Sequence, residues 1–243
     1  MNSRFPLIEV GTVESTMVEA ARLVASGVFE DWTTILAGHQ TGGRGRSGRT
    51  WINDPGDAFL ATVIAKVAIP PERAGLIAIA AGVSVAEVLA QLGVDVRLKW
   101  PNDILVDERK LGGILIQTQL TTPLIALIGI GINLRGLPSG VSDAVTILDL
   151  GVSPPSPADL ARPMVARLRV SVHALEAGGW KQVTCDWTKR ALWLGQPVSL
   201  IAEREISGKL DGIDEFGRLL LRTAEGAVRF TQGEIKRGPR RLA

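Results

Sequence analysis

Apolar positions in the first part of the chain form strand-like runs separated by one stretch with helical spacing. Short apolar runs at 7–10, 33–38 and 57–69 have the length and the β-branched content of buried strands. After the first run, STMVEAARLVASG repeats its apolar side chains at helical spacing and ends at Gly27, which is typical of a helix stop. The pattern therefore predicts strand, helix, strand and strand over this part of the chain.

The middle of the chain adds longer helices and a run of consecutive strands. Pro70 and Pro71 interrupt the chain before a helix predicted at 72–91. The four strand-like segments that follow are VRLKW, DILV, GILIQTQ and LIALIGIGINL. Two further helices are expected at 158–177 and 180–190, after the proline-rich piece SPPSP. Because several strands follow one another without helices between them, we expect part of the sheet to be antiparallel.

The pattern changes again after Gly195. PVSLIAE, EISGKLDGI, GRLLLRT and AVRFTQGEI are short alternating segments joined by glycine and charged turns, which indicates a small all-β unit of about five strands. The predicted fold class is α/β (α+β). We expect a mixed, largely antiparallel sheet with helices in residues 1–192 and a small SH3-like β-barrel in residues 193–243.

Composition and charge exclude several classes of protein. The 243 residues are 46% apolar and 21% charged, and the formal net charge of +2 is too small for a general nucleic-acid-binding surface, so we expect no nucleic-acid partner. The single Cys185 excludes an intrachain disulfide and a cysteine-rich zinc site. There is no signal-peptide pattern and no unbroken apolar run of about 18 residues. We therefore expect a cytoplasmic protein without a membrane partner.

The arginines are unevenly distributed, and their distribution points to a candidate site. The segment TGGRGRSGRTW, residues 41–51 and here called the arginine loop, contains three arginines and four glycines. Glycines let backbone N–H groups approach a ligand closely, and guanidinium groups bind carboxylates and phosphates in a bidentate way. The segment is similar to a dinucleotide-binding turn and to a P-loop, but Pro55 and Gly56 prevent the helix that both would need. We predict a lid over an anionic ligand; the alternative is a solvated basic loop.

Two further segments combine turn residues with polar side chains. KWPNDILVDERKLGGILIQ, residues 99–117, places Asn102 and Asp103 at a strand edge and Lys110 before two glycines. An ordinary hairpin with an exposed lysine would explain the same pattern. GIGINLRG, residues 129–136, is a strand end whose small residues either line a pocket or pack a sheet. Neither segment identifies a ligand by itself.

Three segments, GRGRSGRTW, KWPNDILV with KLGGILIQ, and GIGIN, follow one another along the chain. In this order and spacing they resemble the biotin–protein ligases, and the resemblance extends over nearly the whole chain to GEIKR near its end. It is to the short form without the N-terminal DNA-binding domain. The resemblance implies that ATP and biotin are substrates used with Mg²⁺ and that biotinyl-5′-AMP is formed. It further implies transfer of biotin to a specific lysine of a biotin carboxyl carrier protein domain, by a monomer or a homodimer.

The resemblance also implies roles for individual residues. The expected catalytic residues are Lys110, Asp103 and Arg46. The expected biotin-binding residues are Ser15, Thr16, Gln40, Arg44, Gly45, Arg46, Lys110 and Gly113. The expected ATP- or adenylate-binding residues are Arg49, Trp51, Asn102, Lys110, Ile114, Gly129 and Asn133. Asp103 either orients or deprotonates the carrier lysine, or first helps to organise the metal, and no metal ligand is assigned.

Some features leave alternatives open. Thr16 and Glu19 fit a T-x-x-E capping box, so Ser15 and Thr16 have a structural as well as a binding interpretation. Met17 stands where the family commonly has a small polar residue near the ureido ring, which favours a lipoate– or octanoate–protein ligase of the same fold. A non-catalytic biotin or nucleotide sensor is the other alternative, and the presence of both catalytic candidates, the lysine and the aspartate, argues against it.

Overall fold

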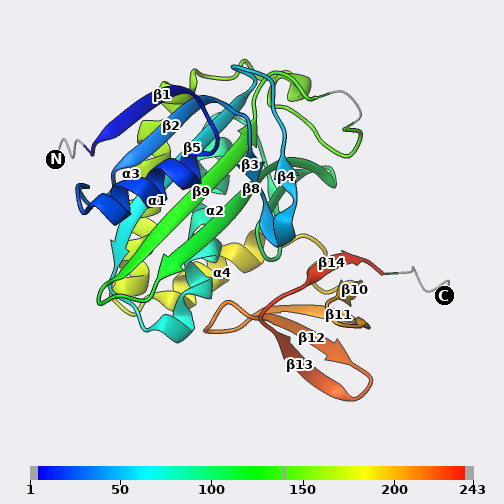
Figure 1. Cartoon of the computed structure of the whole chain (residues 1–243). Helices are drawn as coiled ribbons and strands as arrows, with labels where there is room; N and C mark the ends of the chain where they lie inside the picture. The colour runs from blue at the N-terminus through cyan, green and yellow to red at the C-terminus, as the bar shows by residue number, and fades with distance from the viewer. Residues whose placement is uncertain (1–4, 139–140, 239–243) are drawn as a thin grey trace.

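The computed structural model describes residues 5–138 and 141–238, and its larger part is built on a seven-stranded sheet (Figure 1). The strands of this sheet are β1 (Leu7–Val13), β2 (Thr34–Gln40), β5 (Ala58–Val67), β6 (Arg97–Lys99), β7 (Asp103–Val106), β8 (Arg109–Gln119) and β9 (Leu124–Asn133). They lie in the order β1-β2-β5-β9-β8-β7-β6. Only β1 and β2 pair in parallel, and the other neighbours are antiparallel. The predicted mixed, largely antiparallel sheet is confirmed.

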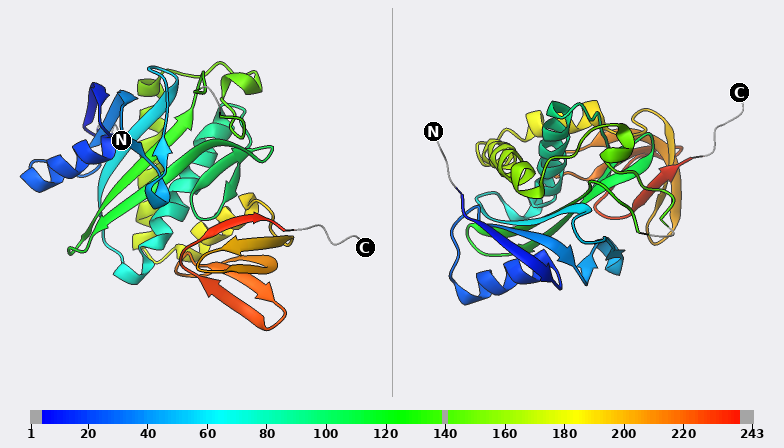
Figure 2. Two further views of the ribbon diagram at one scale, coloured as in Figure 1. Left: turned by 45° about the vertical axis from the view of Figure 1, so that its right-hand side comes forward. Right: turned by 90° about the horizontal axis from the view of Figure 1, so that it is seen from above.

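Helices cover both faces of this sheet. The α-helices are α1 (Thr16–Ser26), α2 (Gly75–Gln91), α3 (Pro157–Glu176) and α4 (Trp180–Arg190). Short 3₁₀ turns, named η1 (Arg46–Gly48), η2 (Pro71–Arg73) and η3 (Leu148–Leu150), occur between them. Helix α1 lies on one face, and α2, α3 and α4 lie on the other (Figure 2). The face with α1 is therefore the less covered one, and it is the face on which a ligand has room to bind.

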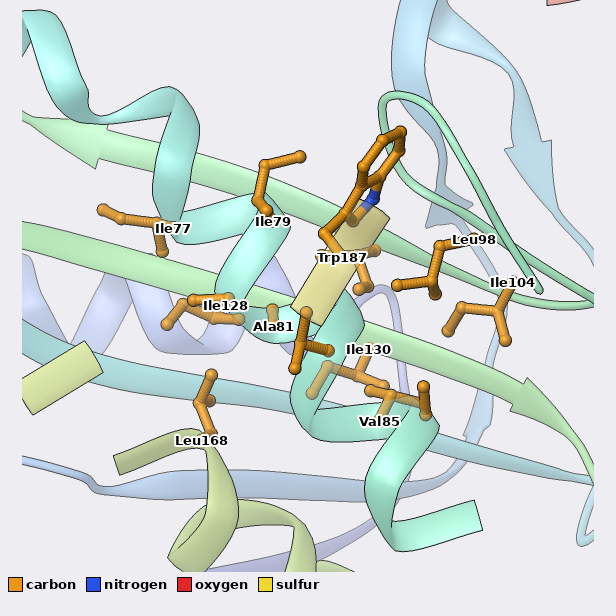
Figure 3. Close-up of a cluster of buried hydrophobic side chains, with 14 of the residues drawn as sticks. Ile77, Ile79, Ala81, Val85, Leu98, Ile104, Ile128, Ile130, Leu168 and Trp187 are labelled. Carbon is orange, nitrogen blue, oxygen red and sulfur yellow. The ribbon is translucent and has the colours of Figure 1, made fainter. Parts of the chain in front are cut away.

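Helix α2 is apolar on nearly all sides because it is buried between the sheet and the other helices. In Figure 3, Ile77 and Ala81 of this helix lie near Ile128 and Ile130 of β9, and Trp187 of α4 completes the layer. All of these side chains belong to one buried cluster. Burial of so many large apolar side chains, each contributing about 1.5–3 kcal/mol, provides the main driving force for this fold.

The helix ends follow local signals in the sequence. Gly27 ends α1 in the left-handed conformation at φ 72°, as the pattern predicts. The helix expected at 72–91 begins only at Gly75, because the residues after Pro70 form the separate turn η2. The predicted start of this helix was therefore too early by about one helical turn. A proline restricts its own φ angle but does not set how many residues precede the helix.

The central strands bring glycines from distant segments into one place. β8 and β9 are antiparallel, as expected for two adjacent buried strands, and Gly113 lies opposite Gly131 in their register. β9 pairs with β5 over its full length, from Ala58 opposite Asn133 to Val67 opposite Leu124.

The part of the chain that the structure describes contains no helix long and apolar enough to cross a membrane.

The C-terminal strands form a second, five-stranded antiparallel sheet. They are β10 (Pro197–Ile201), β11 (Glu205–Ile213), β12 (Leu219–Thr223), β13 (Gly226–Phe230) and β14 (Glu234–Arg237), in the order β13-β12-β11-β10-β14. AVRFTQGEI, expected as one segment, contains two strands that lie at opposite edges. Since no pairing between β13 and β14 is present in the described residues, the sheet is open rather than a closed barrel. The boundary between residues 192 and 193 stays a prediction.

The two sheets are joined through both apolar and polar contacts. The buried cluster around α2 continues into the C-terminal sheet through Val198 and Leu210. The indole nitrogen of Trp100, at the end of β6, donates a hydrogen bond to the carbonyl oxygen of Gly217 at 3.0 Å. Gly233 has φ 137°, and a Cβ atom there would lie 2.7 Å from Leu200. Only glycine fits this turn, which directs the following residue, Glu234, toward the central sheet.

Candidate active site

A cavity of about 150 Å³ is lined by the beginning of α1, the arginine loop, the central strands and the beginning of β14. All of the predicted site residues except Asn133 line it. These residues are Ser15, Thr16, Gln40, Arg44, Gly45, Arg46, Arg49, Trp51, Asn102, Asp103, Lys110, Gly113, Ile114 and Gly129. Segments that are far apart in the sequence thus meet around one space, which is what a binding site requires.

Asn133 lies outside the cavity wall. Its side-chain nitrogen donates hydrogen bonds to the carbonyl oxygens of Lys110 and Val145, both at 3.2 Å. The residue therefore braces the strand that carries Lys110, and its expected contact with an adenylate stays a prediction. Asn102 does line the cavity, and its side-chain nitrogen donates to the carbonyl oxygen of Ile114 at 2.7 Å.

The beginning of α1 is capped by Ser15 and not by Thr16. The hydroxyl oxygen of Ser15 accepts a hydrogen bond from the backbone nitrogen of Met17 at 3.2 Å, while Thr16 is already the first residue of the helix. Glu19 pairs with Arg22 instead of reaching back to the cap. The expected T-x-x-E capping box is therefore wrong, because the cap lies one position earlier and Glu19 takes no part in it. Adjacent serine and threonine residues can both cap a helix, and here the hydroxyl of Thr16 bonds Gln40 instead.

Thr16 instead belongs to a buried hydrogen-bond network at one end of the cavity. Its backbone nitrogen and its hydroxyl both donate to Oε1 of Gln40, at 2.7 and 3.0 Å. The hydroxyl of Thr62 on β5 donates in turn to the hydroxyl oxygen of Thr16 at 2.8 Å. With Oε1 engaged twice, the side-chain nitrogen of Gln40 and the hydroxyl hydrogen of Ser15 are the donors that remain for a ligand.

This network leads to a prediction about stability. Thr16→Val removes the acceptor of the buried Thr62 hydroxyl, so we expect a loss of about 1–3 kcal/mol in the free energy of unfolding, measured with urea. Adding Thr62→Val should recover part of the loss, because both partners are then apolar groups of the same shape. A double variant no more stable than Thr16→Val would show that the Thr62 hydroxyl is not bonded as described.

Asp103, Lys99 and Lys110 form the charged part of the cavity. The Nζ atom of Lys110 lies 2.6 Å from Oδ1 of Asp103, and Nζ of Lys99 lies 3.3 Å from Oδ2. Burial opposes ionisation of Asp103, but the charges and hydrogen bonds of Lys110 and then of Lys99 outweigh it and hold the pKa of this carboxyl below its usual value. Asp103 is therefore ionised at neutral pH.

The three arginines of the arginine loop have different surroundings. Arg44 pairs with Glu14 at 3.3 Å, and Arg49 pairs with Glu234 of β14 at 2.6 Å. Arg46 has no carboxylate within ion-pair distance among residues 5–138 and 141–238.

The contacts of Arg46 leave room for an anion. Its guanidinium donates a long hydrogen bond to the carbonyl oxygen of Gly233 at 3.5 Å. Burial lowers the pKa of Arg46, the charge of Asp103 raises it, and Arg49 lowers it further. A half-buried guanidinium that lacks a paired anion favours the binding of one.

Glycines give the arginine loop a defined shape. Its ends pair as two short antiparallel strands, β3 (Gly43–Arg44) and β4 (Thr50–Trp51). A Cβ atom on Gly43 would lie 2.6 Å from the carbonyl oxygen of Trp51, so only glycine permits this pairing. The loop is thus a small hairpin that holds its arginines over the cavity.

The ring of Trp51, the last residue of the arginine loop, lies against the floor of the cavity. A Cβ atom on Gly131 would lie 3.0 Å from its ring, and Nζ of Lys110 lies 5.9 Å from the ring centre. Its buried indole nitrogen has no hydrogen-bond partner within the described part of the chain. Buried donors are usually satisfied, so this one fits a site whose lid packs differently around a ligand.

Several residues of the cavity wall were not among the predicted site residues, and four of them bear on its chemistry or shape: Thr62, Lys99, Gly131 and Glu234. Lys99 and Glu234 lie inside the motifs KWPND and GEIKR, so the motifs contained a signal that went unused. Thr62 is a polar residue between apolar neighbours in β5, and the structure shows it fully buried. Gly131 lies within GIGIN and is needed where the ring of Trp51 approaches the strand.

Comparisons with known proteins cover both parts of the chain. Residues 12–133 match the Biotin/lipoate A/B protein ligase family, and residues 193–238 match the Biotin protein ligase C terminal domain. The biotin–[acetyl-CoA-carboxylase] ligase of Mycobacterium tuberculosis is 32% identical over 234 residues, which cover 93% of this chain and 86% of that protein.

Solved structures show the same fold over nearly the whole chain. The biotin protein ligase from Aquifex aeolicus in complex with biotin and ATP has a TM-score of 0.81 and 29% identity, covering 95% of this chain and 97% of that chain. The biotin protein ligase from Leishmania major in complex with biotinyl-5-AMP has a TM-score of 0.63 and 25% identity, covering 93% and 99%. The chain therefore belongs to the biotin/lipoate A/B protein ligase family and carries the C-terminal domain of the biotin protein ligases.

Proposed function

We propose that this enzyme activates biotin with ATP and transfers it to a lysine of a biotin carboxyl carrier protein domain. One observation carries the proposal: a single cavity has a neutral hydrogen-bonding end and a cationic end. The neutral end, with Ser15 and Gln40, suits a urea group, which both donates and accepts hydrogen bonds. The cationic end, with Lys110 and Arg46, suits a carboxylate and phosphates. The relatives that bind biotin with ATP or biotinyl-5-AMP support this assignment.

In the first half-reaction, a carboxylate oxygen of biotin attacks the α-phosphorus of ATP. The bond from this phosphorus to the bridging oxygen breaks, and pyrophosphate leaves with the electron pair. Two anions must approach each other, so catalysis depends on positioning and on neutralisation of charge. Lys110 and Arg46 would bind the carboxylate and the α-phosphate oxygens, and Arg49 would face the leaving pyrophosphate. Trp51 and the arginine loop would exclude water from the mixed anhydride.

In the second half-reaction, the lysine amine attacks the acyl carbon and the bond from that carbon to the phosphate oxygen breaks. AMP leaves with the electron pair, and the amine proton passes to solvent. Asp103 is ionised with a pKa below the usual value, which makes it a weak base but a good acceptor for an N–H of the neutral lysine amine, whose lone pair stays free to attack. We therefore assign it the orienting role, and not deprotonation of the carrier lysine.

The cavity residues do not form a metal site of their own. In the described residues, no three or more His, Cys, Asp and Glu side chains come together in a way that could hold a metal ion. The two carboxylates of the cavity, Asp103 and Glu234, are already paired with lysine or arginine side chains. Mg²⁺ is commonly bound through substrate phosphates. It would enter this site bound to the phosphates of ATP.

A lipoate– or octanoate–protein ligase is the second candidate, because of Met17. This side chain lines the cavity next to the polar network, and its methyl group would lie 2.8 Å from a Cβ atom on Gly129. It makes this part of the wall apolar, which suits an alkyl chain. The buried Thr16–Gln40 network favours biotin, because an alkyl chain offers no partner for the remaining donors.

Intact mass spectrometry of a biotin carboxyl carrier domain distinguishes these candidates. The domain is incubated with the enzyme and MgATP, and with biotin, lipoate or octanoate in separate samples. We expect a mass increase of one biotinyl group in the biotin sample alone. An increase only with lipoate or octanoate would identify the enzyme as the second candidate, as the apolar wall at Met17 suggests. No increase in any sample would contradict the proposed function and favour a binding protein without catalysis.

A further inference from the structure

Lys99 has no role in the reaction as described so far, although it is one of the more buried charges of the cavity. It is the last residue of β6, and its side chain is 13% exposed. Its Nζ atom lies 3.3 Å from Oδ2 of Asp103 and 3.7 Å from Oε1 of Glu234. Lys110 contacts the other oxygen, Oδ1, of the same aspartate at 2.6 Å. Each oxygen of Asp103 is therefore paired with a different lysine.

The two lysines differ in what a substrate would do to them. The side chain of Lys110 is 38% exposed, and it lies beside Gly113 and the ring of Trp51. When Lys110 binds the carboxylate of biotin and the α-phosphate, its contact with Asp103 weakens. Asp103 is then a largely buried carboxylate that has lost its nearest cation, which is strongly unfavourable unless another counterion remains.

We propose that Lys99 is this remaining counterion. It keeps Asp103 ionised and in place while Lys110 binds the substrate, so that Asp103 can hold the incoming lysine of the acceptor in the second half-reaction. Lys99 is thus a positioning residue that does not touch the substrate. The inference rests on the proposed function, since it concerns the same reaction. Glu234 of β14 holds Lys99 from the other side, which gives the C-terminal sheet a part in the site.

Three cations face Asp103, and each of them favours its ionised form. Lys99 faces it from β6, Lys110 from β8 and Arg46 from the arginine loop. Glu234, with the opposite sign, lies beyond Lys99 and is also paired with Arg49. If Lys99 is removed, burial acts against ionisation with less compensation, and the pKa of Asp103 rises. In the variant, Asp103 therefore becomes protonated at a higher pH than in the wild type.

The test measures the two half-reactions separately in Lys99→Met, Lys99→Arg and the wild type. Pyrophosphate release reports adenylate formation, and single-turnover transfer from preformed biotinyl-5′-AMP to the acceptor domain reports the second step. We expect Lys99→Met to slow transfer by about 10- to 100-fold, since a displacement of about 1 Å from the reacting geometry can cost about 100-fold. The acidic limb of its transfer–pH profile should move to higher pH, while pyrophosphate release stays within about threefold.

Lys99→Arg keeps the charge and should restore both the transfer rate and the pH profile, which a loss of packing alone would not explain. Lys66→Met, which changes an exposed lysine on β5 outside the cavity, is the matched control and should behave as the wild type. Urea unfolding shows that each variant is folded. Equal slowing of both half-reactions, or an unshifted pH profile in Lys99→Met, would overturn the proposal. A wild type that forms no adenylate would instead contradict the proposed function.

Discussion

Lys110→Ala is expected to abolish formation of biotinyl-5′-AMP while leaving the protein folded. Lys110 is the cavity cation that approaches both Asp103 and the ring of Trp51, so it is placed to bind the oxygens that gain charge in the transition state. Loss of one such donor typically lowers the rate by about 100- to 1000-fold. The measurement is pyrophosphate release with saturating biotin and ATP.

The fold should survive this change because the side chain of Lys110 is partly exposed and its backbone contacts remain. The backbone nitrogen donates to Asp143 at 2.8 Å, and the carbonyl oxygen accepts from Val145 at 2.9 Å. Arg109→Ala is the matched control, since Arg109 is the exposed neighbour on the same strand and does not line the cavity. More than a tenth of wild-type activity in Lys110→Ala would disprove the assignment of the site.

Arg46→Gly is expected to release biotinyl-5′-AMP before it is transferred. Arg46 is half-buried over the cavity without a carboxylate partner among the described residues, so the adenylate would supply its anion. A hydrogen bond to a charged group contributes about 1.5–3 kcal/mol, which corresponds to retention weakened by about 10- to 100-fold. Released adenylate is a reactive mixed anhydride that acylates accessible lysines on any protein nearby.

The measurement is mass spectrometry of an unrelated bystander protein incubated with biotin, MgATP and each enzyme. Arg46→Gly should biotinylate several of its lysines, whereas the wild type should leave it unmodified. Arg46→Lys keeps a cation and should give less labelling than Arg46→Gly. Arg204→Gly, an exposed arginine outside the cavity, is the control for the type of substitution. If Arg46→Gly leaves the bystander unmodified while still forming adenylate, the arginine loop does not retain the intermediate.

Local signals in the sequence predicted most elements of the fold, because the physical cause of each lies in neighbouring residues. Gly27 ends a helix since it alone adopts the left-handed conformation without strain, and helix α4 occupies the predicted residues 180–190. Local sequence signals predicted less well where either of two adjacent residues can cap a helix. Ser15 and Thr16 can both cap a helix, and the choice depended on which side chain was needed by Gln40, a residue on another strand.

The sequence by itself determined the family, the largely antiparallel sheet and about half of the residues that line the cavity, because these depend on short contiguous patterns. Only the tertiary structure decided how those residues are paired. Thr62 meets Thr16 across 46 positions, and Arg49 meets Glu234 across 185. The sheet order β1-β2-β5-β9-β8-β7-β6 does not follow the chain, so the partner of a polar side chain depends on strand order and register and not on its neighbours in sequence. For the same reason the pairing of Lys99 with Glu234 emerges only when the two sheets are packed together, whereas its pairing with Asp103 lies within the β6–β7 pair of one sheet.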